Sequence, residues 1–257
     1  MSAEPVVAIR DLWFSYDGTA VLEDVNLTIE ARDFVSIVGP NGGGKTTLVK
    51  LMLGLLEPGR GTIRVLGGTP AQARPRMGYL PQNVEVDPRF PVSVLDVVLM
   101  GRLGRKRQAG SRRRADRAAA DRALEEVDLS GLRGRAFSAL SGGQRQRTLI
   151  ARALVAEPEL LLMDEPASHL DIAMEEGLYA LLKGLNERLT VVVVSHDLGF
   201  VSQFVKRVVC VKRRVVVHPT SEITGEMIRG IYGGDVRMVR HDHRCAEAGH
   251  EGGAAHG

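Results

Sequence analysis

The 257-residue sequence has two cysteines, 4% aromatic residues and almost no net charge. Cys210 and Cys245 are far apart and form no disulfide framework, which is typical of a reducing compartment. The balance of 34 Lys and Arg against 31 Asp and Glu predicts no nucleic-acid partner. No segment approaches the roughly 18 apolar residues that cross a bilayer, and Glu4, Arg10 and Asp11 argue against a signal peptide. We therefore expect a soluble intracellular protein that acts at a membrane only through partners.

A glycine-rich loop is the first feature that indicates a function. An apolar run over residues 34–38 predicts a strand buried on both faces, and Leu48, Leu51, Met52 and Leu55 have helical spacing. We expect that helix to continue to Glu57-Pro58-Gly59. The loop between strand and helix consists of Gly39, Pro40, Asn41, Gly42, Gly43, Gly44, Lys45, Thr46 and Thr47. Side chains here would keep the backbone from wrapping a phosphate, which the loop amides and the helix N-terminus attract.

Several polar side chains around this loop have predicted roles in ATP hydrolysis. Lys45 is placed to reach the β- and γ-phosphates of ATP, and the hydroxyl of Thr46 to bind Mg²⁺. Asp164 and Glu165 follow the apolar run 160–163. We expect Asp164 to bind Mg²⁺ and Glu165 to act as the general base. The alternatives are that the loop is an ordinary glycine turn and that Asp164 and Glu165 are a solvated acidic pair. Because the glycine loop and the acidic pair occur together in one chain, both alternatives are disfavoured.

Two further residues follow predicted strands. Gln82 comes after Gly78-Tyr79-Leu80-Pro81, and His196 comes after the apolar run 190–194. Ligands of open α/β sheets bind at the carboxyl ends of the strands. We therefore predict that Gln82 binds Mg²⁺ and water and that His196 contacts the γ-phosphate. A surface glutamine and a structural histidine remain the alternatives.

Among nucleotide hydrolases, the class of this protein is narrowed most by the segment Leu140, Ser141, Gly142, Gly143 and Gln144. Ser141 opens a predicted helix, so its hydroxyl can cap that helix and bind an anion there. We expect this segment to contact the γ-phosphate of a second ATP that is held by another subunit. Tyr16 is expected either to stack on adenine or to be a simple core aromatic residue.

The order of predicted elements indicates an α/β fold. Residues 6–29 read as antiparallel strands with a turn at Asp17-Gly18, and 208–217 as a strand pair broken at 212–214. Between the buried strands the pattern is helical, with a capping box at Ser93 and Asp96 and a helix over 112–127. We predict a P-loop ATPase core with an antiparallel β subdomain over residues 1–90 and 155–239. An inserted helical subdomain spans 91–154, and a disordered tail spans 240–257.

Two segments allow a functional and a neutral interpretation. The basic stretch 102–117 is either a solvated helix face or a contact for acidic lipid or a membrane partner. The tail carries possible zinc ligands, or it has no function. Those ligands are His241, His243, Cys245 and His250, with His256 beyond them.

On these motifs the chain resembles the ATP-binding subunits of ABC transporters over residues 6–239. Tyr16 resembles the A-loop aromatic residue, and residues 39–46 resemble the Walker A motif. Gln82 resembles the glutamine of the Q-loop, and residues 140–144 resemble the signature motif. Residues 160–165 resemble the Walker B motif, residues 168–171 resemble the D-loop, and His196 resembles the switch histidine. The resemblance implies a head-to-tail homodimer with two ATP molecules between the subunits. In that dimer Ser141, Gly142, Gly143, Gln144 and Asp171 contact the ATP of the opposite subunit. It also implies membrane-spanning permease subunits, coupled through the region of Gln82, and a place on the cytoplasmic face of the membrane.

A finer resemblance is to the subfamily that imports zinc, manganese or iron(II). It rests on residues 77–82, 90–94, 97–102, 194–199 and 207–211, and it implies an extracytoplasmic metal-binding protein as a further partner. Arg32 departs from the family pattern, which has glycine before Asp33 in this turn. Another transported substrate remains an alternative, as does a cytosolic ABC ATPase of translation, DNA repair or iron–sulfur assembly. The chain has neither the two cassettes usual in translation types nor the long coiled coils of repair types.

Overall fold

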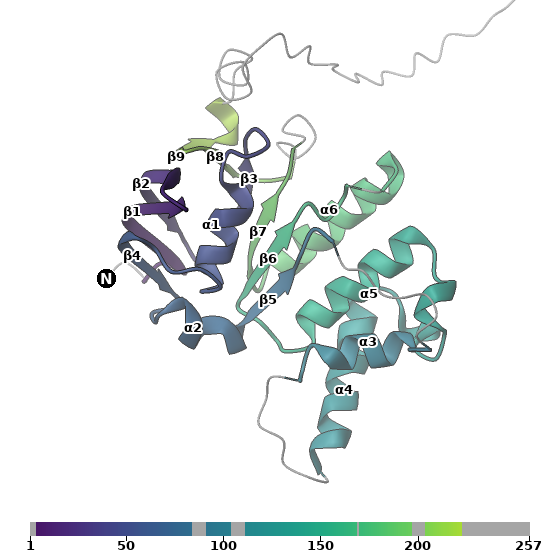
Figure 1. Ribbon diagram of the computed structural model, residues 1–257. Helices are drawn as coiled ribbons and strands as arrows, with labels where there is room; N and C mark the ends of the chain where they lie inside the picture. The colour runs from purple at the N-terminus through teal and green to yellow at the C-terminus, as the bar shows by residue number, and fades with distance from the viewer. Residues whose placement is uncertain (1–3, 84–90, 104–110, 169, 197–203, 223–257) are drawn as a thin grey trace, which may run out of the picture.

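A six-stranded sheet forms the centre of the molecule (Figure 1). The computed structural model describes residues 4–83, 91–103, 111–168, 170–196 and 204–222. The sheet order is β5 (Met77–Leu80), β6 (Leu160–Asp164), β7 (Thr190–Val194), β3 (Phe34–Val38), β8 (Arg207–Lys212) and β9 (Arg214–Pro219). All neighbours pair in parallel except β8 and β9, which are antiparallel. The parallel strands therefore end at one common edge, where the predicted site residues follow them.

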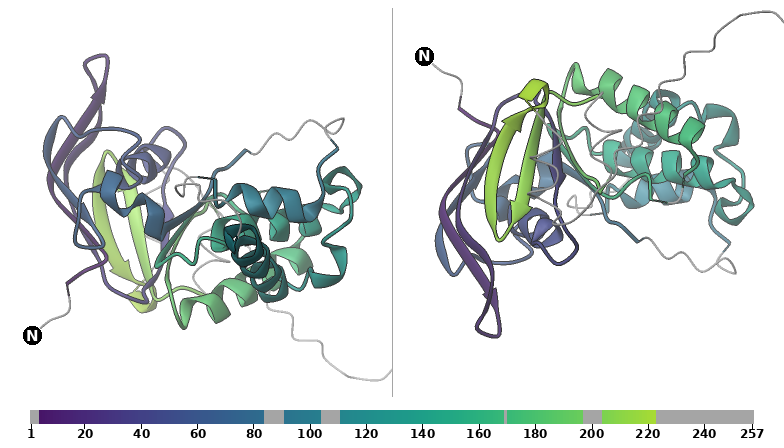
Figure 2. Two further views of the ribbon diagram at one scale, coloured as in Figure 1. Left: turned by 90° about the horizontal axis from the view of Figure 1, so that it is seen from below. Right: turned by 90° about the horizontal axis from the view of Figure 1, so that it is seen from above.

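A second sheet of three antiparallel strands covers one side of the first. It consists of β1 (Val7–Tyr16), β2 (Thr19–Ile29) and β4 (Arg60–Val65), in the order β2-β1-β4. Asp17 and Gly18 connect β1 and β2 with φ of 47° and 80°, the conformation that tight hairpin turns favour. Figure 2 shows this sheet and the helices α3, α4 and α5 on opposite sides of the molecule. The predicted α/β fold with an antiparallel β portion and a helical region is confirmed.

The described part of the chain contains six α-helices beside the two sheets. They are α1 (Lys45–Met52), α2 (Pro70–Ala73), α3 (Val94–Met100), α4 (Ser111–Glu126), α5 (Gly142–Leu154) and α6 (Ile172–Asn186). Short 3₁₀ turns span Arg74–Arg76, Ser130–Leu132, Phe137–Ala139 and Thr220–Glu222. Ser93 caps α3 in the predicted capping box with Asp96, and the hydrogen bonds from Ser93 lower the pKa of the Asp96 carboxyl.

The predicted end of α1 is wrong. The helix stops at Met52, and Gly54 turns the chain with φ of 64°. Leu55 therefore lies outside the helix and is 56% exposed, although its spacing fits the apolar face. Gly54 allows a left-handed residue just after a helix, where it acts as a C-terminal stop. The helix-ending effect of Gly54 therefore outweighs the helical spacing of apolar residues, which continues to Leu55.

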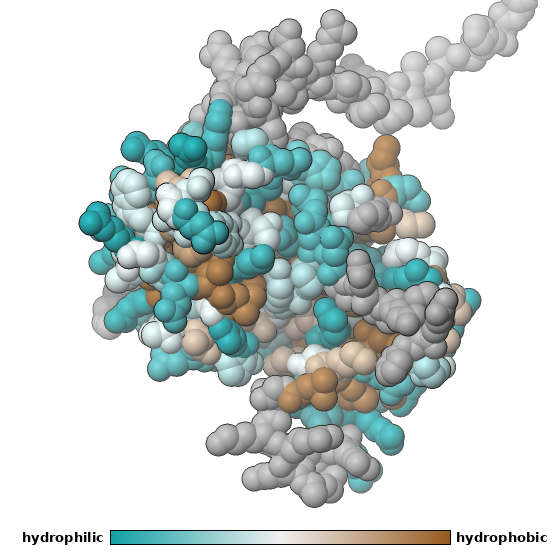
Figure 3. Space-filling view, in the orientation of Figure 1, coloured by the Kyte–Doolittle hydropathy of each residue, from teal (hydrophilic) through white to brown (hydrophobic). Residues whose placement is uncertain are grey.

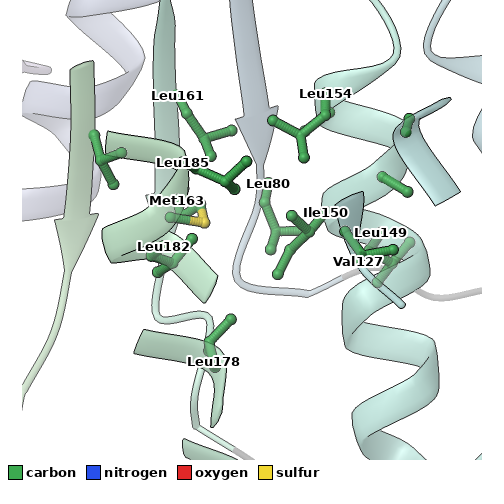
Figure 4. Close-up of a cluster of buried hydrophobic side chains, with 14 of the residues drawn as sticks. Leu80, Val127, Leu149, Ile150, Leu154, Leu161, Met163, Leu178, Leu182 and Leu185 are labelled. Carbon is green, nitrogen blue, oxygen red and sulfur yellow. The ribbon is translucent and has the colours of Figure 1, made fainter. Parts of the chain in front are cut away.

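The near-continuous apolar runs of the central strands arise because each strand contributes to two cores. Leu161 and Met163 of β6 belong to one cluster, whereas Leu160 and Leu162 belong to the other. The first cluster contains residues of α3, α4, α5 and α6, some of which Figure 4 shows: Ile150, Leu154, Leu178, Leu182 and Leu185. The second cluster contains residues of α1 and of the three-stranded sheet. Because side chains alternate along a strand, a strand covered on both faces must be apolar at every position.

Arg32 adopts the conformation that the glycine of the family pattern would provide. Its φ is 60°, a value that costs a residue with a side chain about 1–2 kcal/mol. Two hydrogen bonds fix its backbone: the Arg32 amide donates to Thr190 Oγ1 at 2.9 Å, and Asn186 Nδ2 donates to the Arg32 carbonyl at 3.2 Å. The turn geometry is thus kept without glycine.

None of the helices in the described part of the chain is long and apolar enough to cross a membrane. Apolar side chains nevertheless reach the surface, and Figure 3 shows brown atoms over the lower part of the helical region. Among the exposed large apolar residues are Met100, which ends α3 and is 40% exposed, and Leu103, which is 73% exposed.

Candidate active site

The glycine-rich loop links β3 to α1 at the carboxyl edge of the sheet. Gly39, Gly42 and Gly44 have φ values of 150°, 75° and 104°, which residues with a side chain rarely adopt. Gly42 has open space around the position of a Cβ, whereas a Cβ on Gly44 would lie 2.8 Å from Leu22 Cδ2. The backbone conformation of the loop therefore requires glycine even where space is free.

Strand β8 gives a second reason for glycine in this loop. A Cβ on Gly39 would lie 2.1 Å from the carbonyl oxygen of Val211, and one on Gly43 would lie 2.7 Å from the same oxygen. We expected the glycines only to let the backbone wrap a phosphate. The end of β8 packs so closely against the outside of the loop that a side chain at either position would collide with it.

Lys45 is almost fully buried under the loop. Its Nζ donates hydrogen bonds to the carbonyl oxygens of Gly39 at 2.8 Å and Pro40 at 3.1 Å. Burial lowers the pKa of the Lys45 ammonium, and the nearby charges of Glu165 and Asp164 partly counteract this. Gly44, at the N-cap of α1, provides no side-chain cap for the first helical amides. Uncapped amides beside a buried cation can bind an anion.

Asp164 and Thr46 form a pair of oxygen donors beside the loop. Asp164 is the last residue of β6 and is 2% exposed. Burial raises the pKa of the Asp164 carboxyl, and a hydrogen bond from Thr46 counteracts this. A buried carboxylate and a hydroxyl are hard donors of the kind that Mg²⁺ prefers. In the described residues no group of three or more His, Cys, Asp or Glu could hold a metal. A Mg²⁺ here would therefore also need oxygen atoms from a bound small molecule or from water.

Gln82, Glu165 and His196 meet at the same edge, although they are far apart in sequence. Gln82 Nε2 donates to Glu165 Oε2 at 2.8 Å, and His196 Nδ1 lies 3.9 Å from the same oxygen. Glu165 has φ of 50° directly after β6, and its amide donates to the Val194 carbonyl at 3.0 Å. Such a strained residue is common at functional sites. The left-handed turn lets Glu165 leave the strand direction that Asp164 still follows.

An open cleft of about 790 Å³ connects these groups. It is lined by the loop residues 41–47, by Gln82, Glu165 and His196, and by Tyr16 and Val21. Tyr16 is 43% exposed and makes an edge-to-face contact with Phe14, with ring centroids 4.8 Å apart. Tyr16 is therefore no core residue, and its ring is available at the rim of the cleft. The volume lies within the range of small-molecule sites.

The segment 140–144 lies away from that cleft. Ser141 caps α5: its Oγ accepts from the Gln144 amide at 3.3 Å, and Gln144 Oε1 accepts from the Ser141 amide at 3.1 Å. No residue of 140–144 lines the cleft. Asp171 likewise caps α6, with its carboxylate accepting from the Met174 amide at 2.8 Å. A Cβ on Gly143 would lie 3.1 Å from Met174 Sδ, so the segment 140–144 packs on the first turn of α6, which Asp171 caps.

Sequence reasoning missed several residues around the cleft. Val21 lines it from β2, and Val211 supports the loop from outside. Tyr79 of β5 is near Asp164: burial raises the pKa of the Tyr79 hydroxyl, and the charge of Asp164 adds to this. Sequence analysis assigned no site role to these residues, because their places near the loop or Asp164 result from the packing of strands that are far apart in sequence. The predicted tail ligands His241, His243, Cys245 and His250 lie outside the described residues, as do residues 104–110 of the basic stretch 102–117.

Comparison with known proteins gives a consistent result. The ABC transporter family matches residues 22–168. The zinc transport system ATP-binding protein TroB of Treponema pallidum is 40% identical over 90% of this chain and 88% of its own length. The manganese transport system ATP-binding protein MntB of Bacillus subtilis is 38% identical over 91% and 95%. A dimeric ATP-binding cassette bound to ADP and Pi is 28% identical, with a TM-score of 0.70 over 83% of this chain and 98% of that one.

Proposed function

The chain belongs to the ABC transporter family and is one of its ATPases, and from this premise we propose that it powers the import of a divalent transition metal, zinc or manganese. The names of TroB and MntB support the cargo, since they refer to zinc and manganese transport. The sequence patterns shared with the metal-importing subfamily support it as well. The cargo itself does not enter the ATP cleft, so the support comes from relatives and not from the chemistry of the site.

ATP would bind with its phosphates on the loop and its adenine against Tyr16. The loop amides and the N-terminus of α1 bind the phosphate oxygens, and Lys45 exchanges its bonds to loop carbonyls for the β- and γ-phosphates. Thr46, Asp164 and Gln82 would hold Mg²⁺, which neutralises phosphate charge when it is bound. The raised pKa of the buried Asp164 fits this role, because a cation would favour its ionised form.

Hydrolysis would use the cluster around Glu165. A water oxygen attacks the γ-phosphorus, the bond to the β–γ bridging oxygen breaks, ADP leaves, and the proton of the water passes to the Glu165 carboxylate. Gln82 holds one oxygen of that carboxylate, which leaves the other for the water. His196 follows β7 by two residues and lies 3.9 Å from the oxygen that Gln82 holds, where it would contact the γ-phosphate.

One observation carries this proposal: the cluster of Gln82, Glu165 and His196 lines the same cleft as the phosphate loop. Either feature alone allows a neutral explanation. A general base placed beside a phosphate-binding loop supports phosphoryl transfer to water.

A second subunit would complete the site. Ser141 and Asp171 are the helix-capping residues of α5 and α6 and lie apart from the cleft of their own chain. In a head-to-tail dimer the N-terminus of α5 would contribute its amides to the γ-phosphate of the other chain. The similarity to a cassette that is dimeric with ADP and Pi supports this arrangement.

The permease would dock on the helical side of the molecule. Met100 and Leu103 are apolar and exposed there, and exposed apolar patches often mark protein interfaces. Gln82 lines the cleft and begins the stretch of chain that connects β5 with α3. A permease helix on this surface would be connected to the catalytic cluster through that segment.

Metal uptake by a strain that lacks the gene tests the cargo. We expect poor growth under chelation and reduced accumulation of zinc or manganese, restored by the wild-type gene and not by Lys45→Ala. Glu176→Gln, a change of an exposed carboxylate on α6, is the matched control and should restore uptake. Unchanged accumulation of both metals, in the absence of a second importer, would contradict the metal proposal but not the ATPase assignment.

A further inference from the structure

The turn between β8 and β9 consists of a single residue. The strands pair from Arg207 with Pro219 to Lys212 with Arg214, which leaves Arg213 alone at the apex. Its φ is 59°, a conformation that disfavours β-branched residues most and glycine least. The reversal is therefore as tight as the chain permits and depends on a left-handed residue at this position.

This turn is bonded to the glycine-rich loop and to β2. The Arg213 amide donates to the Gly43 carbonyl at 3.2 Å, and the Glu23 amide donates to the Arg213 carbonyl at 2.8 Å. The Val211 carbonyl fills the space beside Gly39 and Gly43. The backbone of one residue thus connects three segments that are far apart in sequence.

We propose that Arg213 is a positioning residue for the nucleotide site, through its main-chain amide rather than its side chain. The inference rests on the proposed binding of ATP by the loop. The Gly43 carbonyl and the Gly44 amide belong to one planar trans peptide, so they point in opposite directions. A bond that holds the carbonyl toward Arg213 directs the Gly44 amide away from the turn. Gly43 and Gly44 both line the cleft, where that amide can meet a phosphate.

The side chain of Arg213 contributes little to this arrangement. It is 66% exposed, and its Nη1 lies 4.0 Å from Glu23 Oε1. Such a surface ion pair is weak. A replacement at 213 should therefore act through its tolerance of positive φ and not through its charge.

Calorimetric titration of the full chain with Mg·ATP tests the proposal. Arg213→Val should raise the dissociation constant about tenfold, as the loss of one aligned hydrogen bond and a strained turn would predict. Arg213→Gly removes the same charge, but glycine tolerates the left-handed φ and so leaves the amide in place. This variant should bind Mg·ATP within about twofold of wild type. Arg214→Val is the matched control: it makes the same substitution one residue later, at an exposed strand position, and should also bind like wild type.

Thermal unfolding separates an effect on the loop from a loss of folding. If Arg213→Val does not fold, Arg213→Ala takes its place with an intermediate effect. Wild-type affinity in the Val or Ala variant would overturn the proposal, as would equal weakening by Arg213→Gly or by Arg214→Val. Failure of the wild-type chain to bind Mg·ATP would instead contradict the proposed function.

Discussion

Replacement of Glu165 by glutamine should separate ATP binding from ATP hydrolysis. Glutamine has nearly the same size as glutamate, and its side-chain oxygen can still accept the hydrogen bond that Gln82 donates at 2.8 Å. The amide cannot accept a proton from water at neutral pH. Lys45, Thr46 and the glycine loop are untouched, so the variant should hold ATP in an unreacted state.

The expected loss of rate is that of a general base. Such a group contributes about 10²–10⁴-fold, or about 2.7–5.4 kcal/mol of barrier at about 1.36 kcal/mol per decade. The affinity for Mg·ATP should rise, whereas the rate of hydrolysis falls. The negative charge of Glu165 contributes to the raised pKa of Asp164, so its removal favours the ionised Asp164 that would bind Mg²⁺. Tighter Mg·ATP binding and slower turnover are expected together.

The assays are phosphate release and size-exclusion chromatography with Mg·ATP. The Glu165→Gln chain should elute as a dimer under conditions in which wild type is monomeric or forms the dimer transiently. Glu176→Gln, which changes an exposed carboxylate on α6, serves as control and should keep its rate within about twofold, as a surface substitution does. A Glu165→Gln chain that stays monomeric and hydrolyses ATP at the wild-type rate would refute the role of Glu165.

Three further changes test other parts of the site and fold. Ser141→Arg should leave Mg·ATP binding by the monomer intact and abolish dimer-dependent hydrolysis; loss of binding by the monomer would show that Ser141 serves its own chain. Asp164→Asn should abolish hydrolysis but raise the melting temperature at about pH 7. The raised pKa of the buried Asp164 means that ionisation costs stability above the folded pKa, so the gain should vanish below its ordinary value of 3.8; equal gain at all pH values contradicts this cause. Arg32→Gly should raise the free energy of unfolding by about 0.5–1 kcal/mol, since it relieves φ of 60° at some cost in unfolded-state entropy; a lower melting temperature would show that the Arg32 side chain stabilises the turn.

Local signals in the sequence were sufficient for the central strands. The predicted ranges of β3 and β7 agree with the structure residue for residue, because a strand covered on both faces leaves an uninterrupted apolar run. The capping residues Ser93 and Ser141 were also predicted, since a cap and its partner are three residues apart. The end of α1 was not, because the apolar period continued through Gly54 to Leu55.

The arrangement of the site depends on contacts that local patterns do not encode. Gln82 and Glu165 are 83 residues apart, and their hydrogen bond follows from the pairing of β5 with β6. Their separate motifs could be identified in the sequence, but the bond could not. The same is true of Arg213, which the sequence presents only as one of three basic residues at a strand break. Its bond to Gly43 spans 170 residues of chain and requires the position of β8 next to β3.

The division of β6 between two cores restricts where the chain can gain or lose residues. A one-residue insertion or deletion before Leu161 would exchange the side chains that face α5 and α6 with those that face α1. A two-residue change would restore the faces but displace Asp164 and Glu165 along the strand by about 6.6 Å, more than the 2.8 Å bond to Gln82 allows. Length changes that keep this site intact are therefore confined to the connections outside the strand.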